Sequence, residues 1–298
     1  MFKSLIRTFA IVAAFIAGYM MPGLHVYSWM FKWMLIVMLF VTFLGIRFKR
    51  MKPERAHWLL TGANLMVALA AWGVCRLVFG DGYLAQAAFF VGIMPTATAA
   101  PVVMGLLGGS VEFMLTALLL INGIICALLP FILPAVVGRG GFEIYLNVAQ
   151  NISLVMLLPL ALALAARRFY PHAIAWPRKL KDVTFGIWVV ILVLIAANAS
   201  YDISSREGIS ERVLEQIGVI ALLVCGVNFG LGYLLGGRTR AAECSQALGQ
   251  KNTTLSIYLA LTYASPIAAL GPTFYVLWHN LWDAWQLYRA SERKRRDG

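Results

Sequence analysis

Ten long apolar runs constrain this chain more than any other feature of its sequence. A membrane-spanning helix needs about 20 mostly apolar residues, and runs of about that length fill the 298 residues almost end to end. The runs cover residues 5–22, 27–47, 57–79, 82–107, 110–136, 142–166, 183–203, 212–236, 241–269 and 271–289. The sequence therefore predicts an all-α polytopic membrane protein, with a single transmembrane domain over residues 1–298 and no soluble domain attached.

The composition supports a membrane protein and excludes several other classes. Hydrophobic residues make up 61% of the chain and charged residues 13%, whereas soluble domains are about half apolar and a quarter charged. The four cysteines lie in or beside apolar runs without a C-x-x-C pair, which indicates buried hydrophobic residues rather than ligands or disulfides. No nucleotide-binding loop, nucleophile elbow or metal motif is present. We therefore expect neither an enzyme nor a cofactor.

The basic residues predict how the chain is oriented in the membrane. With ten spans, nineteen Lys and Arg side chains fall on the side of the two termini, and five fall on the other side. Those five are Lys32, Arg76, Arg139, Arg206 and Arg212, and Lys251 belongs to neither side. Because basic loops stay in the cytoplasm, both termini are expected to be cytoplasmic in a bacterial-type inner membrane. The net charge of +12 then reflects topology, not a nucleic-acid partner.

The first run has an alternative interpretation as a secretory signal peptide. Lys3 and Arg7 precede its apolar residues, as in such peptides. However, the run extends to Met21 without a clear small-residue cleavage site, and a second run follows directly. We expect it to be retained as a span.

Helix-breaking and polar residues interrupt the fourth and ninth runs. The fourth run contains Gly92, Pro95, Thr96, Thr98 and Pro101. The ninth run contains Gly249, Gln250, Lys251, Asn252, Thr253 and Thr254. Proline removes a backbone donor from a helix, and unwound backbone inside a membrane occurs only where protein or a watery cavity surrounds it. Either run alone could be a simple kink, but the two together indicate a binding site.

The two interruptions occupy corresponding places in two halves of the chain. Each half has five spans, about 1–139 and about 140–298, and each interruption falls in the fourth span of its half. Because five is odd, the halves run through the membrane in opposite directions. This pattern is typical of inverted-repeat transporters, whose discontinuous helices cross near the midplane.

Several short elements resemble the bile acid:sodium symporter family, whose members have ten spans. They are Met38-Leu39-Phe40 followed by Leu44, Met94-Pro95-Thr96-Ala97-Thr98-Ala99-Ala100-Pro101-Val102, Pro130 with Pro134, Leu157-Leu158-Pro159-Leu160, and Gly249-Gln250-Lys251-Asn252-Thr253-Thr254-Leu255. The second is similar to the family's P-G-G-T-A-S-N-V element and the last to its E-x-G-x-Q-N-x-x-L element. The resemblance implies transport of a small organic anion by alternating access. It also implies a panel of spans one, two, six and seven, and a core that contains the broken helices.

The chain departs from the family pattern where that pattern implies two sodium sites. Ala247 stands at the position of the ninth-helix glutamate, and Lys251 at that of the glutamine. Ala100-Pro101 replaces the Ser-Asn pair, Asn64 replaces the third-helix glutamine, and Asn122 and Cys126 replace two hydroxyl residues. Because hard cations need several oxygen ligands, we expect no bound sodium. The substrate that we expect is a carboxylate.

Lys251 is the residue on which the predicted site depends. A lysine in the middle of a membrane costs about 2.5–3.5 kcal/mol, so it should meet a partner or a cavity. Its ammonium could replace a bound cation, or it could gain and lose a proton during a transport cycle; alternatively, it could extend to the cytoplasmic surface. The predicted site consists of Lys251, Asn252, Gln250, Thr253, Thr254, Thr96, Thr98, Asn64 and Asn122, with helix breaks at Pro95, Pro101 and Gly249.

The remaining polar residues of the spans favour less specific roles. The other acids lie in loops or near the ends of the runs, so only Glu243 and Asp283 are assigned to the spans themselves, and no carboxylate cluster is expected near the midplane. A polar stripe in the tenth run, which contains His279, Asn280, Asp283 and Gln286, is interpreted as helix-packing contacts. Two other functions stay open at this stage. They are a proton-coupled carrier that uses Lys251, and a membrane sensor that binds a ligand without transporting it.

Overall fold

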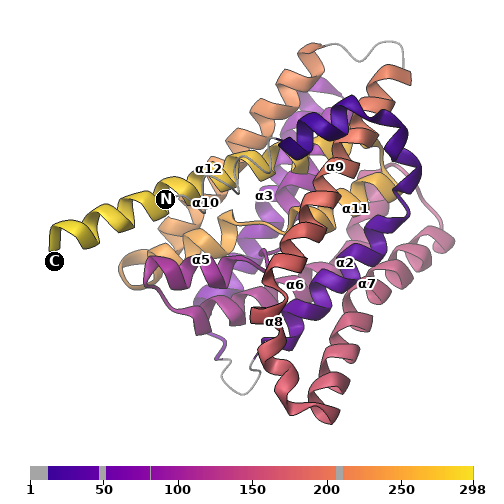
Figure 1. The fold of residues 1–298 in the computed structure, drawn as a ribbon. Coiled ribbons are helices and arrows are strands. Elements are labelled where there is room, and N and C mark those ends of the chain that lie inside the picture. Colours follow the sequence, from indigo (N-terminus) through magenta and orange to yellow (C-terminus); the bar gives the residue numbers. More distant parts are fainter. Residues whose placement is uncertain (1–12, 47–51, 81, 206–210, 298) are drawn as a thin grey trace. The chain divides into compact units, whose positions relative to one another are not determined.

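The chain folds as an all-α membrane protein. The computed structural model describes residues 13–46, 52–80, 82–205 and 211–297, and within these ranges it contains helices and no extended strand (Figure 1). Five of the described helices are long and apolar enough to cross a membrane. These candidate spans are Arg55–Phe79, Val111–Val136, Phe142–Phe169, Lys181–Asn198 and Glu211–Gly249.

The chain divides into two compact units. Unit 1 consists of Met1–Lys49 and Cys126–Ile209, and unit 2 of Arg50–Ile125 and Ser210–Gly298. The boundary between them passes through helix α6 (Val111–Val136). Unit 1 contains the runs expected as spans one, two, six and seven, and unit 2 contains both interrupted runs.

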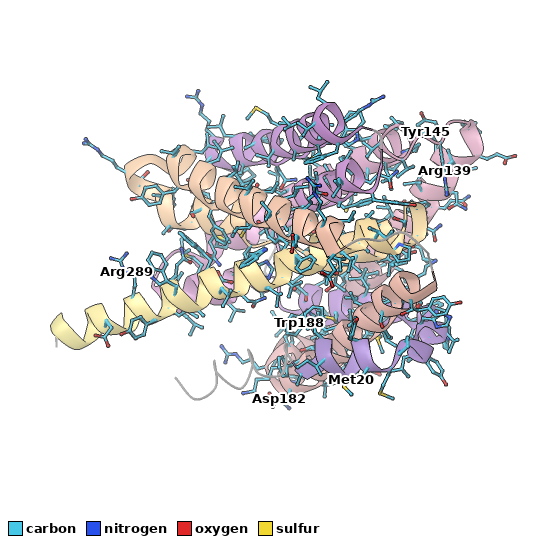
Figure 2. The ribbon with its side chains drawn as sticks, turned by 90° about the horizontal axis from the view of Figure 1, so that it is seen from above. Met20, Arg139, Tyr145, Asp182, Trp188 and Arg289 are labelled. Atoms are coloured by element: carbon cyan, nitrogen blue, oxygen red, sulfur yellow. The ribbon has the colours of Figure 1, made fainter. Side chains whose placement is uncertain are left out.

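Unit 1 is built from helices that pack around α2 (Met30–Leu44). Its other elements are η1 (Pro22–Tyr27), α7 (Phe142–Phe169), η3 (Pro171–Ala175), α8 (Trp176–Lys179) and α9 (Lys181–Ser205). Helix α2 packs against α7 and α9, and η1 packs against α9. Asp182 and Trp188 mark the first turns of α9 in Figure 2. The Lys32 ammonium on α2 donates to the Asn151 amide oxygen on α7 at 2.9 Å.

Unit 2 holds both interrupted runs. Its elements are α3 (Arg55–Phe79), α4 (Tyr83–Ile93), α5 (Ala100–Leu107), the first part of α6, α10 (Glu211–Gly249), α11 (Thr253–Tyr263) and α12 (Pro266–Asp297). Helix α3 packs on α4 and α10, and α12 packs on α4, α10 and α11. Gly92 allows the close approach of α3 and α4, because a Cβ there would lie 2.5 Å from the Ala68 Cα.

Helix α10 is a sharp helical hairpin that contains one predicted span and the beginning of the next. Gly237, with φ +58°, and Arg240, with φ −130°, leave the helical conformation between its two arms. A positive φ favours glycine because it has no Cβ. A Cβ at Gly232 would lie 2.4 Å from the Cys244 carbonyl oxygen, so the arms touch through backbone atoms. The second arm, which ends at Gly249, leads directly into the ninth-run interruption.

Both helix interruptions lie where the sequence predicts them. Helix α4 ends at Ile93 and α5 begins at Ala100, while α10 ends at Gly249 and α11 begins at Thr253. The prediction that Pro101 breaks a helix is wrong, because Pro101 lies in the first turn of α5. A proline fits there, since the first turn of a helix has no internal partner for its N–H. Pro95 lies inside the non-helical segment.

Candidate functional site

The two non-helical segments of unit 2 pair with each other. Thr96 and Lys251 form an isolated antiparallel β-bridge. The Ala97 N–H donates to the Gln250 carbonyl at 2.8 Å, and the Asn252 N–H donates to the Pro95 carbonyl at 2.8 Å. These bonds satisfy backbone groups that the broken helices leave unpaired. The flanking pattern makes Thr96 and Lys251 a non-hydrogen-bonded pair, the kind in which opposite side chains lie closest. We call this paired region, residues 94–99 and 250–252, the crossover.

Hydrogen bonds with two helices, α6 and α10, fix the first segment of the crossover. The Asn122 amide on α6 donates to the Thr96 carbonyl at 2.9 Å and to the Leu118 carbonyl at 2.7 Å. The Thr96 hydroxyl donates to the Ala247 carbonyl at the end of α10, at 2.7 Å. Thr96 is fully buried and Asn122 nearly so. Hydrogen bonds to α6 on one side and to α10 on the other therefore fix the position of the segment.

Lys251 lies at the centre of the crossover and is enclosed by protein. Only 1% of its surface is exposed. Its ammonium donates to the Asn64 amide oxygen on α3 and to the Gly92 carbonyl on α4, the latter at 3.4 Å. Asn64 in turn donates to the Ile93 carbonyl at 3.2 Å. This burial excludes the alternative in which the lysine extends to the cytoplasmic surface. The ammonium therefore lies against two oxygen acceptors.

The second segment of the crossover is held by its own cap and by α12. The Asn252 side chain accepts a hydrogen bond from the Leu255 N–H at 3.3 Å, as an N-cap does for α11. The carbonyl of Gly249 accepts from the Tyr275 hydroxyl on α12 at 2.7 Å. A Cβ at Gly249 would lie 2.3 Å from the Phe229 ring, so this break requires glycine. The amide nitrogen of Asn252 is buried without a partner among the described residues.

Not every predicted site residue joins the lysine. Asn122 was a candidate partner of the ammonium, but it binds the Thr96 carbonyl instead. Gln250 turns to Gln246 on α10, at 2.9 Å. Thr98 is half-buried in the turn before α5. Thr253 and Thr254 are buried in the first turn of α11. Within the described part of the chain, the side chains of these three threonines make no hydrogen bond.

Sequence reasoning missed two features of this region. The Gly92 carbonyl could not be found from residue type, because every residue has a carbonyl and only the fold selects one. The contact between Gln246 and Asp283 was also missed, since the two residues lie on different helices. Among the described residues, no group of three His, Cys, Asp or Glu side chains could hold a metal ion.

The comparisons with known proteins identify no relative. No protein-family model matches the chain, and a search of curated proteins finds no similar sequence. What this region does must therefore be argued from its own geometry. That geometry is a buried cation at the junction of two interrupted helices.

Proposed function

We propose that this protein is a secondary active transporter that resembles the bile acid:sodium symporter family. In this proposal it has ten spans in two inverted five-helix repeats, with both termini in the cytoplasm of a bacterial-type inner membrane. It moves a small organic anion, a carboxylate, by alternating access, and sodium does not drive it. One observation carries the proposal: the buried Lys251 ammonium lies where two interrupted helices pair.

The charge of the crossover supports an anionic substrate. Helices α5 and α11 both begin within a few residues of the Thr96–Lys251 bridge. The N-terminus of a helix carries partial positive charge and unpaired N–H groups. Together with the lysine, these two ends place positive charge at the crossover, and in the described part of the chain no carboxylate forms a salt bridge with Lys251. A carboxylate substrate fits this positive charge, whereas a cationic one does not.

The same residues support sodium independence. The Lys251 ammonium already donates to oxygen atoms that a bound cation would otherwise need. Ala247, Ala100 and Pro101 carry no side-chain oxygen. A second cation beside the lysine would also be repelled. Sodium at millimolar concentration should therefore stabilise the protein no more than potassium or choline does, and a saturable sodium-selective stabilisation would contradict the proposal.

A flux measurement tests the transport function directly. The purified protein is screened by thermal shift against a panel of small mono- and dicarboxylates, and the acid that stabilises it most is used for uptake into proteoliposomes. We expect uptake that is unchanged when potassium replaces sodium, and that is abolished by Lys251→Ala. The matched control is Lys32→Gln in unit 1, because Lys32 also donates to an asparagine amide but lies outside the crossover.

Other outcomes of this experiment would overturn the proposal. Saturable binding without uptake would favour a membrane sensor with the same fold. Uptake whose pH dependence disappears in a normally folded Lys251→Gln variant would make Lys251 a proton carrier instead of a fixed cation.

A further inference from the structure

A second buried ionisable group lies in unit 2, outside the crossover. Asp283 on α12 exposes 5% of its surface. The amide nitrogen of Gln246 on α10 donates to the Asp283 carboxylate at 2.8 Å and to the Gln250 amide oxygen at 2.9 Å. A chain of hydrogen bonds therefore runs from Asp283 through Gln246 to Gln250. Gln250 is the residue that precedes Lys251 and belongs to the crossover.

Two buried amide oxygens in this part of the protein, those of Gln246 and Gln286, have no hydrogen-bond donor among the described residues. An amide nitrogen has two hydrogens, and Gln246 uses both. The Gln246 oxygen, the Gln286 oxygen and the His279 Nδ1 are buried without a partner among the described residues. His279 and Gln286 lie four residues before and three after Asp283, on the same face of α12. A buried acceptor without a donor is unfavourable, so one added hydrogen would stabilise these side chains.

Asp283 differs in this respect from Glu243, the other acid within the predicted spans. Glu243 accepts from the Ser110 N–H at 3.1 Å and lies 3.5 Å from the Arg240 guanidinium. In the described ranges, no ion pair reaches Asp283. The missing positive charge leaves two ways to satisfy the Asp283 carboxyl group: a bound cation or a bound proton.

The helices packed on α12 supply few other charges. Helices α4, α5 and α11 contain no Asp, Glu, Lys, Arg or His. The titratable and charged groups nearest to this part of α12, on α10, on α12 itself and in the crossover, are Cys225, Arg240, Glu243, Lys251, Tyr275 and His279. Arg289, further along α12, stacks over the Trp285 ring at 5.0 Å and projects from the C-terminal part of the helix in Figure 2. None of the described cations makes a salt bridge with Asp283.

We propose that Asp283 is a proton-binding site whose protonation reverses the hydrogen-bond chain through Gln246 and Gln250. The proton comes from water, forms an O–H bond on the carboxylate and returns to water when that bond breaks. Before protonation, the Gln246 oxygen has no hydrogen-bond partner in the described ranges. After protonation, the Gln246 amide turns over, and its oxygen accepts a hydrogen bond from the new Asp283 hydroxyl. A turned Gln250 amide donates to the second lone pair of the same oxygen. The two amide orientations have nearly the same shape, so the reversal needs no repacking of Gln246, and it moves the two Gln246 N–H hydrogens to the position that its oxygen occupies before protonation.

The reversal ends beside the crossover. The backbone carbonyl of Gln250 accepts from the Ala97 N–H, and the next residue is Lys251. A change in the Gln250 side chain therefore acts on the segment that pairs with Thr96. As a coupling step for transport this rests on the proposed function, whereas proton binding itself does not.

Infrared difference spectroscopy of the full chain in lipid nanodiscs tests the proton site without any transport substrate. An ordinary carboxyl group stays ionised from about pH 5 to about pH 9. We expect a protonated-carboxyl C=O band that titrates within this window in the wild type, disappears in Asp283→Asn and persists in the matched control Glu243→Gln. A band unchanged in Asp283→Asn, or no titrating band in the wild type, would overturn the proposal.

Two further variants separate proton binding from folding defects and from a sodium site. Asp283→Glu should retain a titrating band even if Asp283→Asn folds poorly. Gln246→Leu should retain the band and shift its midpoint, because the donor that faces the carboxylate is gone; an unshifted midpoint would overturn the role of Gln246. A wild-type band abolished by sodium but not by potassium would assign the site to a metal cation instead. A band that behaves as expected, without measurable uptake, would count against the transporter and not against the proton site.

Discussion

Two of the buried ionisable side chains of unit 2, Lys251 and Asp283, have opposite surroundings. Lys251 is a cation among oxygen acceptors, so its hydrogens meet the Asn64 amide and the Gly92 carbonyl. Asp283 is an acid beside further acceptors, so the unpartnered atoms around it lack hydrogens. The ammonium has two oxygen acceptors, whereas the carboxylate would gain a donor to its surroundings by binding a proton. In our proposals, Lys251 therefore keeps a fixed charge, whereas Asp283 gains and loses a proton.

Removing the lysine should have the largest effect on stability. Lys251→Met keeps most of the side-chain volume but removes every donor, which leaves the buried oxygens of Asn64 and Gly92 facing each other. Each unsatisfied buried acceptor costs about 1–3 kcal/mol, so we expect the free energy of unfolding to fall by about 2 kcal/mol. Thermal melting in detergent would measure this change. Lys251→Gln should recover part of the loss, because it restores an amide donor.

A double-mutant cycle shows whether that loss comes from the broken bond. Replacing both partners with apolar groups can be nearly neutral. We therefore expect Lys251→Met combined with Asn64→Leu to be less destabilised than the sum of the two single variants, by about 1 kcal/mol. Strict additivity would show that the lysine and Asn64 do not act together. If the lysine variants melted like the parent, the assignment of Lys251 to the site would be wrong.

Neutralising the acid should have the opposite sign. Asp283→Asn removes an unpaired buried charge and adds an amide that can donate to the unpartnered oxygens of Gln246 or Gln286. We expect it to match the parent or exceed it by about 1 kcal/mol in the free energy of unfolding. Melting measured at several pH values should also show a weaker pH dependence in this variant. A loss as large as that of Lys251→Met would remove the contrast between the two sites.

A smaller loss is expected at the edge of the crossover. Thr96→Val is nearly isosteric and removes the hydroxyl bond to the Ala247 carbonyl. A single neutral hydrogen bond contributes about 1 kcal/mol, so the melting temperature should fall less than in Lys251→Met. The backbone bonds of the bridge remain in this variant. An unchanged melting temperature would mean that these backbone bonds alone position the segment.

The smallest effect is expected at Glu243. Its partner Arg240 is partly exposed and lies 3.5 Å away, and the oxygen of a glutamine can still accept from the Ser110 N–H. Glu243→Gln should therefore change the free energy of unfolding by about 0.5 kcal/mol or less, and should leave the infrared titration of Asp283 unchanged. A pronounced effect on that titration would mean that the two acids titrate together.

Local sequence patterns predicted the positions of the two interruptions closely. Pro95 and Gly249 act on the backbone next to them, so their effect can be inferred without knowing the fold. The same reasoning misplaced Pro101, because a proline in the first turn of a helix starts it as readily as it ends one. The sequence also indicated that Lys251 needs a partner, since an unpaired lysine is costly inside a membrane.

Which partners these residues have is a property of the tertiary structure. Lys251 bonds to Asn64, 187 positions earlier in the chain, whereas Asn122, an equally plausible amide, bonds to the Thr96 carbonyl instead. The sequence pattern predicted that Asp283 belongs to a helix-packing stripe. In the structure, its carboxylate accepts a hydrogen bond from Gln246 on α10.

The physical reason is the range of each signal. Apolar runs, prolines, glycines and charge alternation act on neighbouring residues and on the membrane, so the sequence by itself determined the apolar helices, their interruptions and the need to bury Lys251 with a partner. A hydrogen bond depends on the position of two atoms to within a few tenths of an ångström. Only the packing of α3, α4, α10 and α12 decided that the lysine has oxygen acceptors and that the Asp283 carboxylate has an amide donor but no ion pair among the described residues.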